Sequence, residues 1–97
     1  MKTTQTPQPI ERREYPQGTE VLASHMLSGE LGTWRVVESN KVFTTLAQKV
    51  GENIAEQVIS NESTSKPVRP WQYLLIPPTP RFQKRFLHYQ QILEAAA

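Results

Sequence analysis

Prolines enclose the most apolar segment of this chain and determine its secondary structure. Pro70 precedes residues 71–76, and Pro77 and Pro78 follow them. A helix cannot extend past these prolines, because proline lacks a backbone N–H and disfavours helical geometry in the residue before it. The interval between them is too short for a stable helix. Residues 71–76 are therefore predicted to form a β-strand. Their continuous apolar run indicates burial on both faces, as in a strand paired inside a sheet with a helix over it.

A β-hairpin is predicted for residues 18–39. Residues 21–26 show a strand-like alternation, and residues 33–38 are rich in aromatic and β-branched side chains. Between them, residues 28–32 include Gly29 and Gly32, which tolerate the positive φ angles of a tight loop. This pattern is typical of two antiparallel strands joined by a short loop.

Residues 40–61 are predicted to form one long amphipathic helix, because apolar side chains recur at every fourth position. The apolar positions are Val42, Leu46, Val50, Ile54 and Val58. The polar positions opposite them are Gln48, Lys49, Glu52 and Glu56. Ser39 or Asn40 caps this helix at its start. Gly51 inside it costs about 1 kcal/mol relative to Ala, and either close packing against the sheet or simple tolerance explains its presence.

A second helix is predicted after Thr79, which serves as its N-cap, with Pro80 at the first helical position. Its apolar stripe follows the spacing i, i+4, i+7 and i+11. The members of the stripe are Phe82, Phe86, Tyr89 and Leu93. The predicted fold class is α+β, a small β-β-α-β-α domain that covers residues 18–97.

Residues 1–17 are predicted to be a disordered N-terminal arm ahead of this domain. They are rich in Thr, Gln and Pro, carry both charges at residues 11–14, and show no apolar periodicity. Such a composition cannot bury enough apolar surface to offset the entropy lost on ordering. The arm is either a tail that orders on a partner or a free terminus, and the second is the commoner case.

The chain contains no Cys and no Asp, and this excludes several kinds of site. Disulfides and thiolate chemistry need Cys, and two separated histidines do not make a structural zinc site. Mechanisms that require an aspartate are ruled out, and no metal or cofactor is predicted. The chain has no secretory signal and no apolar run of about 20 residues, so we expect a cytoplasmic protein without a membrane partner.

Positive charge is concentrated in the C-terminal third of the chain. The net charge of the whole chain is only +2, but residues 66–97 carry a single Glu and several Lys and Arg residues. The basic residues of the last helix share a face turned away from its apolar stripe. They are Arg81, Lys84, Arg85 and His88. This face is predicted to contact nucleic-acid phosphates without reading sequence. The alternative is a solvated face without a partner, which the small net charge favours.

No catalytic constellation is recognised in the sequence. His25 and His88 are isolated, a Ser-His-Asp triad lacks its Asp, and the glycines are too scattered for a phosphate-binding loop. Trp71 and Tyr73 could stack on bases, although aromatic residues in such a strand are more often core residues. Binding without catalysis is therefore favoured.

The hairpin, the predicted long helix and the strand at residues 70–77 follow one another in an order found in a known nuclease family. They resemble the C-terminal nuclease region of restriction-enzyme helicase subunits, in the PD-(D/E)xK superfamily. The resemblance implies acids that bind Mg²⁺ and a lysine that helps to position the attacking water. Gln17 replaces the family's aspartate, Glu38 matches, Asn40 stands where the lysine would be, and Lys41 comes one place late. The resemblance therefore implies a degenerate site that would hold Mg²⁺ poorly.

Three hypotheses follow, in order of preference. The first is a non-catalytic binding module, a nucleic-acid-associated accessory protein of a DNA-processing or defence system. The second is a structural or accessory subunit that docks on a larger protein complex or on a second copy of itself, because so small a domain leaves part of its sheet uncovered. The third is an active nuclease that depends on Glu38.

Overall fold

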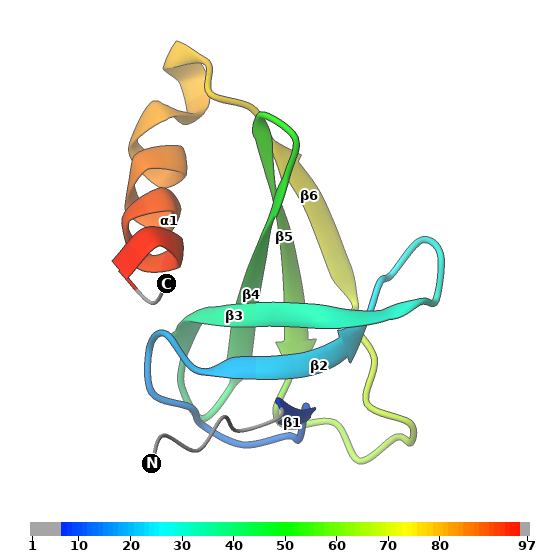
Figure 1. Cartoon of the computed structure of the whole chain (residues 1–97). Helices are drawn as coiled ribbons and strands as arrows, with labels where there is room; N and C mark the ends of the chain where they lie inside the picture. Colours follow the sequence, from blue (N-terminus) through cyan, green and yellow to red (C-terminus); the bar gives the residue numbers. More distant parts are fainter. Residues whose placement is uncertain (1–6, 96–97) are drawn as a thin grey trace, which may run out of the picture.

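The computed structural model describes residues 7–95, which form a six-stranded mixed β-sheet followed by a C-terminal helix (Figure 1). The elements are β1 (Gln8–Pro9), β2 (Glu20–Ser24), β3 (Leu31–Ser39), β4 (Phe43–Val50), β5 (Asn53–Ser60), β6 (Gln72–Ile76), the 3-10 helix η1 (Pro80–Phe82) and α1 (Gln83–Ala95). The spatial order of the strands equals their order in the chain. β1 pairs with β2 in parallel, and the other neighbours are antiparallel. The α+β class is confirmed, but the predicted β-β-α-β-α order is wrong.

The error lies in residues 40–61, which form the hairpin of β4 and β5 instead of a helix. Val50 pairs with Asn53, so the loop contains only Gly51 and Glu52. Gly51 has a φ of 59°, and a glycine with positive φ at the first loop position is typical of a type II′ turn. A repeat of four residues is also a multiple of two, so it describes one face of a strand as well as one face of a helix. The turn at Gly51 was the signal that distinguishes the two.

The other predicted strands are present. β2 and β3 form the predicted hairpin, with residues 25–30 as its loop and a hydrogen bond from the His25 N–H to the Glu30 carbonyl. β6 forms where the prolines confine it. However, β6 lies at the edge of the sheet and not inside it, and Leu75 is 40% exposed. The prediction of burial on both faces of β6 is therefore wrong.

The sheet separates two hydrophobic cores. Figure 1 shows β2 and β3 crossing the direction of β4, β5 and β6, so the sheet curls around one of its faces. We call the cluster on that face the inner core. It contains Ile10, Tyr15, Val21, Ala23, Trp34, Val36, Leu46, Ala55 and Ile59. The helix-side core lies under α1. It contains Val37, Ala47, Ile54, Ile76, Phe86 and Tyr89.

A register shift between Val36 and Glu38 marks a β-bulge in β3. Val36 belongs to the inner core and Val37 to the helix-side core. After the shift Glu38 pairs with Thr45. Thr45 lies two residues before Ala47 on β4, so the two share the helix-side face of the sheet. Because cross-strand partners share a face, Glu38 is turned toward the helix side of the sheet and away from the inner core.

α1 confirms the predicted C-terminal helix. Phe86 and Tyr89 are buried in the helix-side core, and the partly buried Phe82 and Leu93 pack against the same core. Pro80 stands at the first position of η1, as predicted, whereas the Thr79 side chain makes no capping hydrogen bond. Within residues 7–95, no helix has the length and apolar character needed to cross a bilayer.

Part of the predicted disordered arm is ordered on the sheet. β1 pairs with β2, and Ile10 and Tyr15 are buried in the inner core. The Arg12 guanidinium donates to the carbonyls of Ser60 and Ser65, which joins this segment to the end of β5 and to the loop after it. The prediction of disorder is therefore wrong for residues 7–17. Residues 1–6 lie outside the described residues.

Candidate functional site

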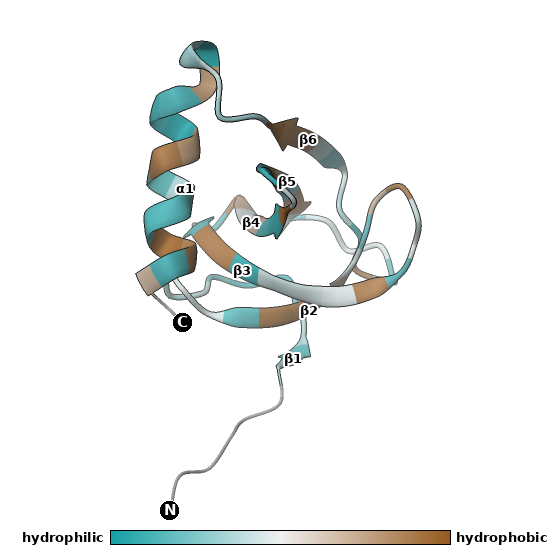
Figure 2. Ribbon diagram, turned by 45° about the horizontal axis from the view of Figure 1, so that its top comes forward, coloured by the Kyte–Doolittle hydropathy of each residue, from teal (hydrophilic) through white to brown (hydrophobic). Residues whose placement is uncertain are grey.

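The predicted basic residues are exposed on the helical end of the molecule. Arg81 lies in η1, and Lys84, Arg85 and His88 lie in the first half of α1. The buried Phe86 and Tyr89 hold α1 against the sheet, and the four basic side chains are exposed. In Figure 2 the ribbon of α1 carries teal, hydrophilic bands that alternate with brown, hydrophobic ones. We call the four residues together the basic face.

A further cation, Lys49 of β4, lies under the start of α1. The Lys49 Nζ lies 4.8 Å from the centroid of the ring of Phe86, a residue in the first turns of α1. Sequence reasoning missed Lys49 because it placed this residue on the polar side of a helix. A cavity of 500 Å³ lies at η1 and the start of α1, and three cationic side chains contribute to its wall. Its lining residues are Pro80, Arg81, Phe82, Lys84 and Arg85.

Two of these cations have no carboxylate partner. Arg81 and Lys84 form no salt bridge among residues 7–95, and the Arg81 guanidinium lies 5.7 Å from the Phe82 ring centroid. α1 has Glu94 as its acidic residue, in the last turn. The positive charge at η1 and the start of α1 is therefore available to an external anion.

Arg85 differs from them because it faces a buried acid. Glu56 on β5 is 6% exposed and accepts a 2.5 Å hydrogen bond from the Tyr89 hydroxyl. The Arg85 Nη1 lies 3.9 Å from the other carboxylate oxygen of Glu56. Burial raises the pKa of Tyr89 well above its ordinary range, and the hydrogen bond to Glu56 raises it further. Sequence reasoning missed this group too, because the predicted helix placed Glu56 in solvent.

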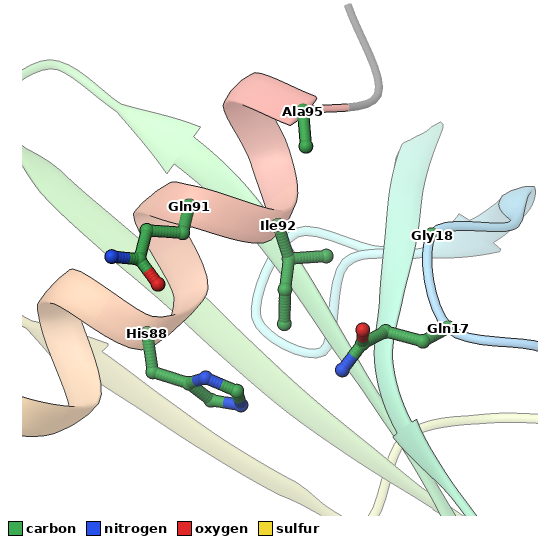
Figure 3. Close-up of a pocket in the computed structure, with 6 residues that line it drawn as sticks. All are labelled: Gln17, Gly18, His88, Gln91, Ile92 and Ala95. Carbon is green, nitrogen blue, oxygen red and sulfur yellow. The ribbon is translucent and has the colours of Figure 1, made fainter.

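A second cavity separates α1 from the chain segment before β2. Figure 3 shows His88 and Gln91 of α1 on one side and Gln17 on the other, with Ile92 between them. Its volume is 530 Å³, and its remaining lining residues are Gly18 and Ala95. The imidazole and the two amides give this cleft a polar lining, and it continues the basic face toward the end of α1.

The positions that carry the nuclease resemblance lie in different parts of the β3 region. The Gln17 amide donates to the Val37 carbonyl at 3.3 Å, so Gln17 does lie beside the strand that carries Glu38. The Asn40 Oδ1 accepts hydrogen bonds from the Val42 and Phe43 N–H groups and shapes the turn between β3 and β4. Lys41 is exposed in that turn. Among residues 7–95, no three His or Glu side chains are grouped so that they could hold a metal ion.

His25 and Tyr73 pack against other side chains of the fold, whereas Trp71 is exposed. The His25 ring packs 5.0 Å from Tyr73 and 5.9 Å from Trp34, and its Nδ1 accepts the Leu27 N–H. Tyr73 packs on the inner core, as expected of a core residue. Trp71 is 58% exposed, so the expectation that it belongs to the core is wrong.

No protein-family model, curated protein or solved structure matches this chain. Its function is therefore inferred from its own side chains, and the resemblance to the nuclease family stays a prediction.

Proposed function

We propose that this chain is a non-catalytic module that binds nucleic acid through the basic face of η1 and α1. One observation carries the proposal: Arg81 and Lys84 are exposed side by side without a carboxylate partner in the described part of the chain. Arg85 lines the same cavity as these two residues, and His88 follows it on α1.

A phosphate backbone is the anion that fits this arrangement. Several separate cations along about two turns of helix match a polymer with regularly spaced charges better than a single small anion. Arginine offers a planar fork of donors for phosphate oxygens, and lysine acts as a point charge. Contacts of this kind position a protein on the backbone and release condensed counterions, which makes affinity depend steeply on salt.

A role in binding and not in catalysis has separate support. The family positions supply a single carboxylate at Glu38, whereas Gln17 is neutral and already donates to the backbone of β3. The buried Glu56 is committed to Tyr89 and Arg85.

The proposal is tested by fluorescence anisotropy with a 24-base-pair mixed-sequence DNA duplex and its single strand at about 50 mM salt. The double variant Arg81→Glu/Lys84→Glu should bind at least about 10-fold more weakly than the wild type, because it replaces two attractive charges by repulsive ones. Lys41→Glu is the matched control, since Lys41 is an exposed cation in the β3–β4 turn, and it should change affinity by less than about 3-fold. Absence of binding by the wild type, or equal binding by the double variant, refutes the proposal.

A second candidate function, docking on a larger protein or on a second copy, has an observation of its own. Leu27 and Leu31 in and beside the β2–β3 loop are 72% and 73% exposed, and Figure 2 shows the hydrophobic colour on this loop. The Met26 N–H donates to the buried Gln57 side chain at 2.6 Å, which holds the loop near β5 and the open edge of β6. Exposed leucines beside an open strand edge are typical of a docking surface. Sedimentation of the wild type as a monomer at all concentrations, with no protein bound after purification from its host, would exclude this candidate.

A further inference from the structure

Resting on the proposed function, we infer that the nucleic acid is B-form duplex DNA and that α1 binds in its major groove. The surface that carries this inference is the outer side of α1, opposite Phe86 and Tyr89. At 100° per residue, the side chains within about 50° of that direction include both charged and uncharged ones. They are Lys84, Leu87, His88, Gln91 and Ala95, all of which are exposed, and the last three also line the 530 Å³ cavity.

α1 has the dimensions of a groove-binding element. Its 13 residues span about 20 Å, and a helix with its side chains is about 10–12 Å across. The B-form major groove is about 12 Å wide and admits an α-helix. Figures 1 and 2 show that the sheet covers one side of α1 and that no other described element covers its outer side.

Three residues of the outer side, Leu87, His88 and Gln91, match the edges of base pairs. The Gln91 amide and the His88 imidazole carry donors and acceptors suited to the groove edges of purines. Leu87 is 46% exposed although it lies on a polar surface. An apolar side chain at this position fits the methyl group of thymine, which only the major groove presents.

The flanks of α1 provide the backbone contacts. Arg81 of η1 and Lys84 and Arg85 of α1 all line the 500 Å³ cavity. Of the two residues in α1, Lys84 lies closer to the direction opposite Phe86 and Tyr89. A helix seated in the groove brings such flanking cations close to one phosphate strand.

Other nucleic acids fit this surface less well. The major groove of an RNA duplex is too deep and narrow for side chains to read. Single strands are bound mainly by stacking of bases on exposed aromatic rings. Among residues 7–95, Trp71 is the exposed Trp, Tyr or Phe residue, but it precedes β6 whereas η1 follows β6, so the two lie at opposite ends of that strand.

The test compares four probes of one sequence at about 50 mM salt: a DNA duplex, the same duplex with glucosylated 5-hydroxymethylcytosine at every cytosine, an RNA duplex, and single-stranded DNA. The glucosyl groups fill the major groove and leave the phosphates unchanged. We expect the unmodified DNA duplex to bind at least about 10-fold more tightly than each of the other three. Equal, salt-dependent binding to all four overturns the inference and leaves the proposed function intact, whereas absence of binding to any probe overturns both.

A variant separates the base-facing side chains from the charges. Leu87→Ala/Gln91→Ala should weaken binding to the unmodified duplex at least about 5-fold and leave the slope of log affinity against log salt unchanged, because neither residue is charged. Gln72→Ala on β6 is the matched control, since this glutamine is exposed and distant in the chain from α1. Wild-type affinity of the double variant, in a protein that retains its circular dichroism spectrum, overturns the inference.

Discussion

The hydrogen bond between Tyr89 and Glu56 leads to a quantitative prediction about how α1 is held on the sheet. Both residues are at least nine-tenths buried, and the hydroxyl lies 2.5 Å from the carboxylate. Tyr89→Phe removes the donor and leaves the carboxylate with the Arg85 guanidinium at 3.9 Å. Because a hydrogen bond to a charged group contributes about 1.5–3 kcal/mol, we expect the free energy of unfolding to fall by about 2 kcal/mol.

The reverse truncation should be costly for the same reason. Glu56→Leu leaves the buried Tyr89 hydroxyl without its acceptor, at an expected cost of about 1–3 kcal/mol. The double variant Glu56→Leu/Tyr89→Phe replaces both polar partners by apolar groups, and such replacements are often close to neutral. The sum of the two single losses should therefore exceed the loss in the double variant by at least about 1 kcal/mol.

Urea unfolding followed by tryptophan fluorescence measures these differences, since Trp34 is 2% exposed and reports on the inner core. Tyr73→Phe is the matched control, because it removes the hydroxyl of a half-buried tyrosine at the edge strand, and it should change stability by less than about 0.5 kcal/mol. A Tyr89→Phe variant within about 0.5 kcal/mol of the wild type, or additive losses in the double variant, would refute the reasoning.

Three further predictions concern other parts of the fold. Gly51→Ala should lower the free energy of unfolding by about 1 kcal/mol, because the φ of 59° strains any residue with a Cβ; an unchanged urea midpoint would contradict this. Arg12→Ala should cost about 2 kcal/mol by removing the donors to the Ser60 and Ser65 carbonyls, and a loss below about 0.5 kcal/mol in urea unfolding would argue against that role. Burial raises the pKa of Tyr89 above its ordinary value of 10.0, and Glu56 raises it further by a smaller amount. As the pH rises, the unfolded chain therefore releases this proton before the folded chain does. Stability is therefore complete below pH 10 and falls above it, by at most about 1.4 kcal/mol per pH unit, and Tyr89→Phe should remove this part of the fall in urea titrations at about pH 9 to 11.5.

The parts of the fold that local chemistry determines were predictable from the sequence. Prolines confine β6 to residues 72–76 and begin η1 at Pro80, and the apolar stripe of α1 has a spacing that only a helix satisfies. Each of these signals is independent of what packs against the segment.

The hairpin of β4 and β5 was not predictable from its apolar spacing, because the same residues fit one face of a helix. Most residues of β4 and β5 are buried on both faces, between the inner core and the helix-side core. Such strands lack the alternation of polar and apolar residues that marks a strand with one solvated face. The positive φ of Gly51 and the many β-branched residues around it were the remaining evidence for a hairpin.

The same error concealed half of the candidate site. The basic residues of α1 could be grouped from helix geometry alone, since they belong to one continuous element. Lys49 and Glu56 come from the strands under that helix, and their positions depend on the pairing of β4 with β5. Contacts between elements of this kind follow from the topology and not from any local pattern.

The number of phosphates that the basic face neutralises tests the central proposal most directly. With Arg81, Lys84 and Arg85 each contacting a phosphate of duplex DNA, the slope of log affinity against log salt should be about −2.7. Lys84→Ala should make this slope shallower by about 0.9, and Lys41→Ala should leave it unchanged. A wild-type slope near zero, or an equal change with both substitutions, would contradict binding through the basic face.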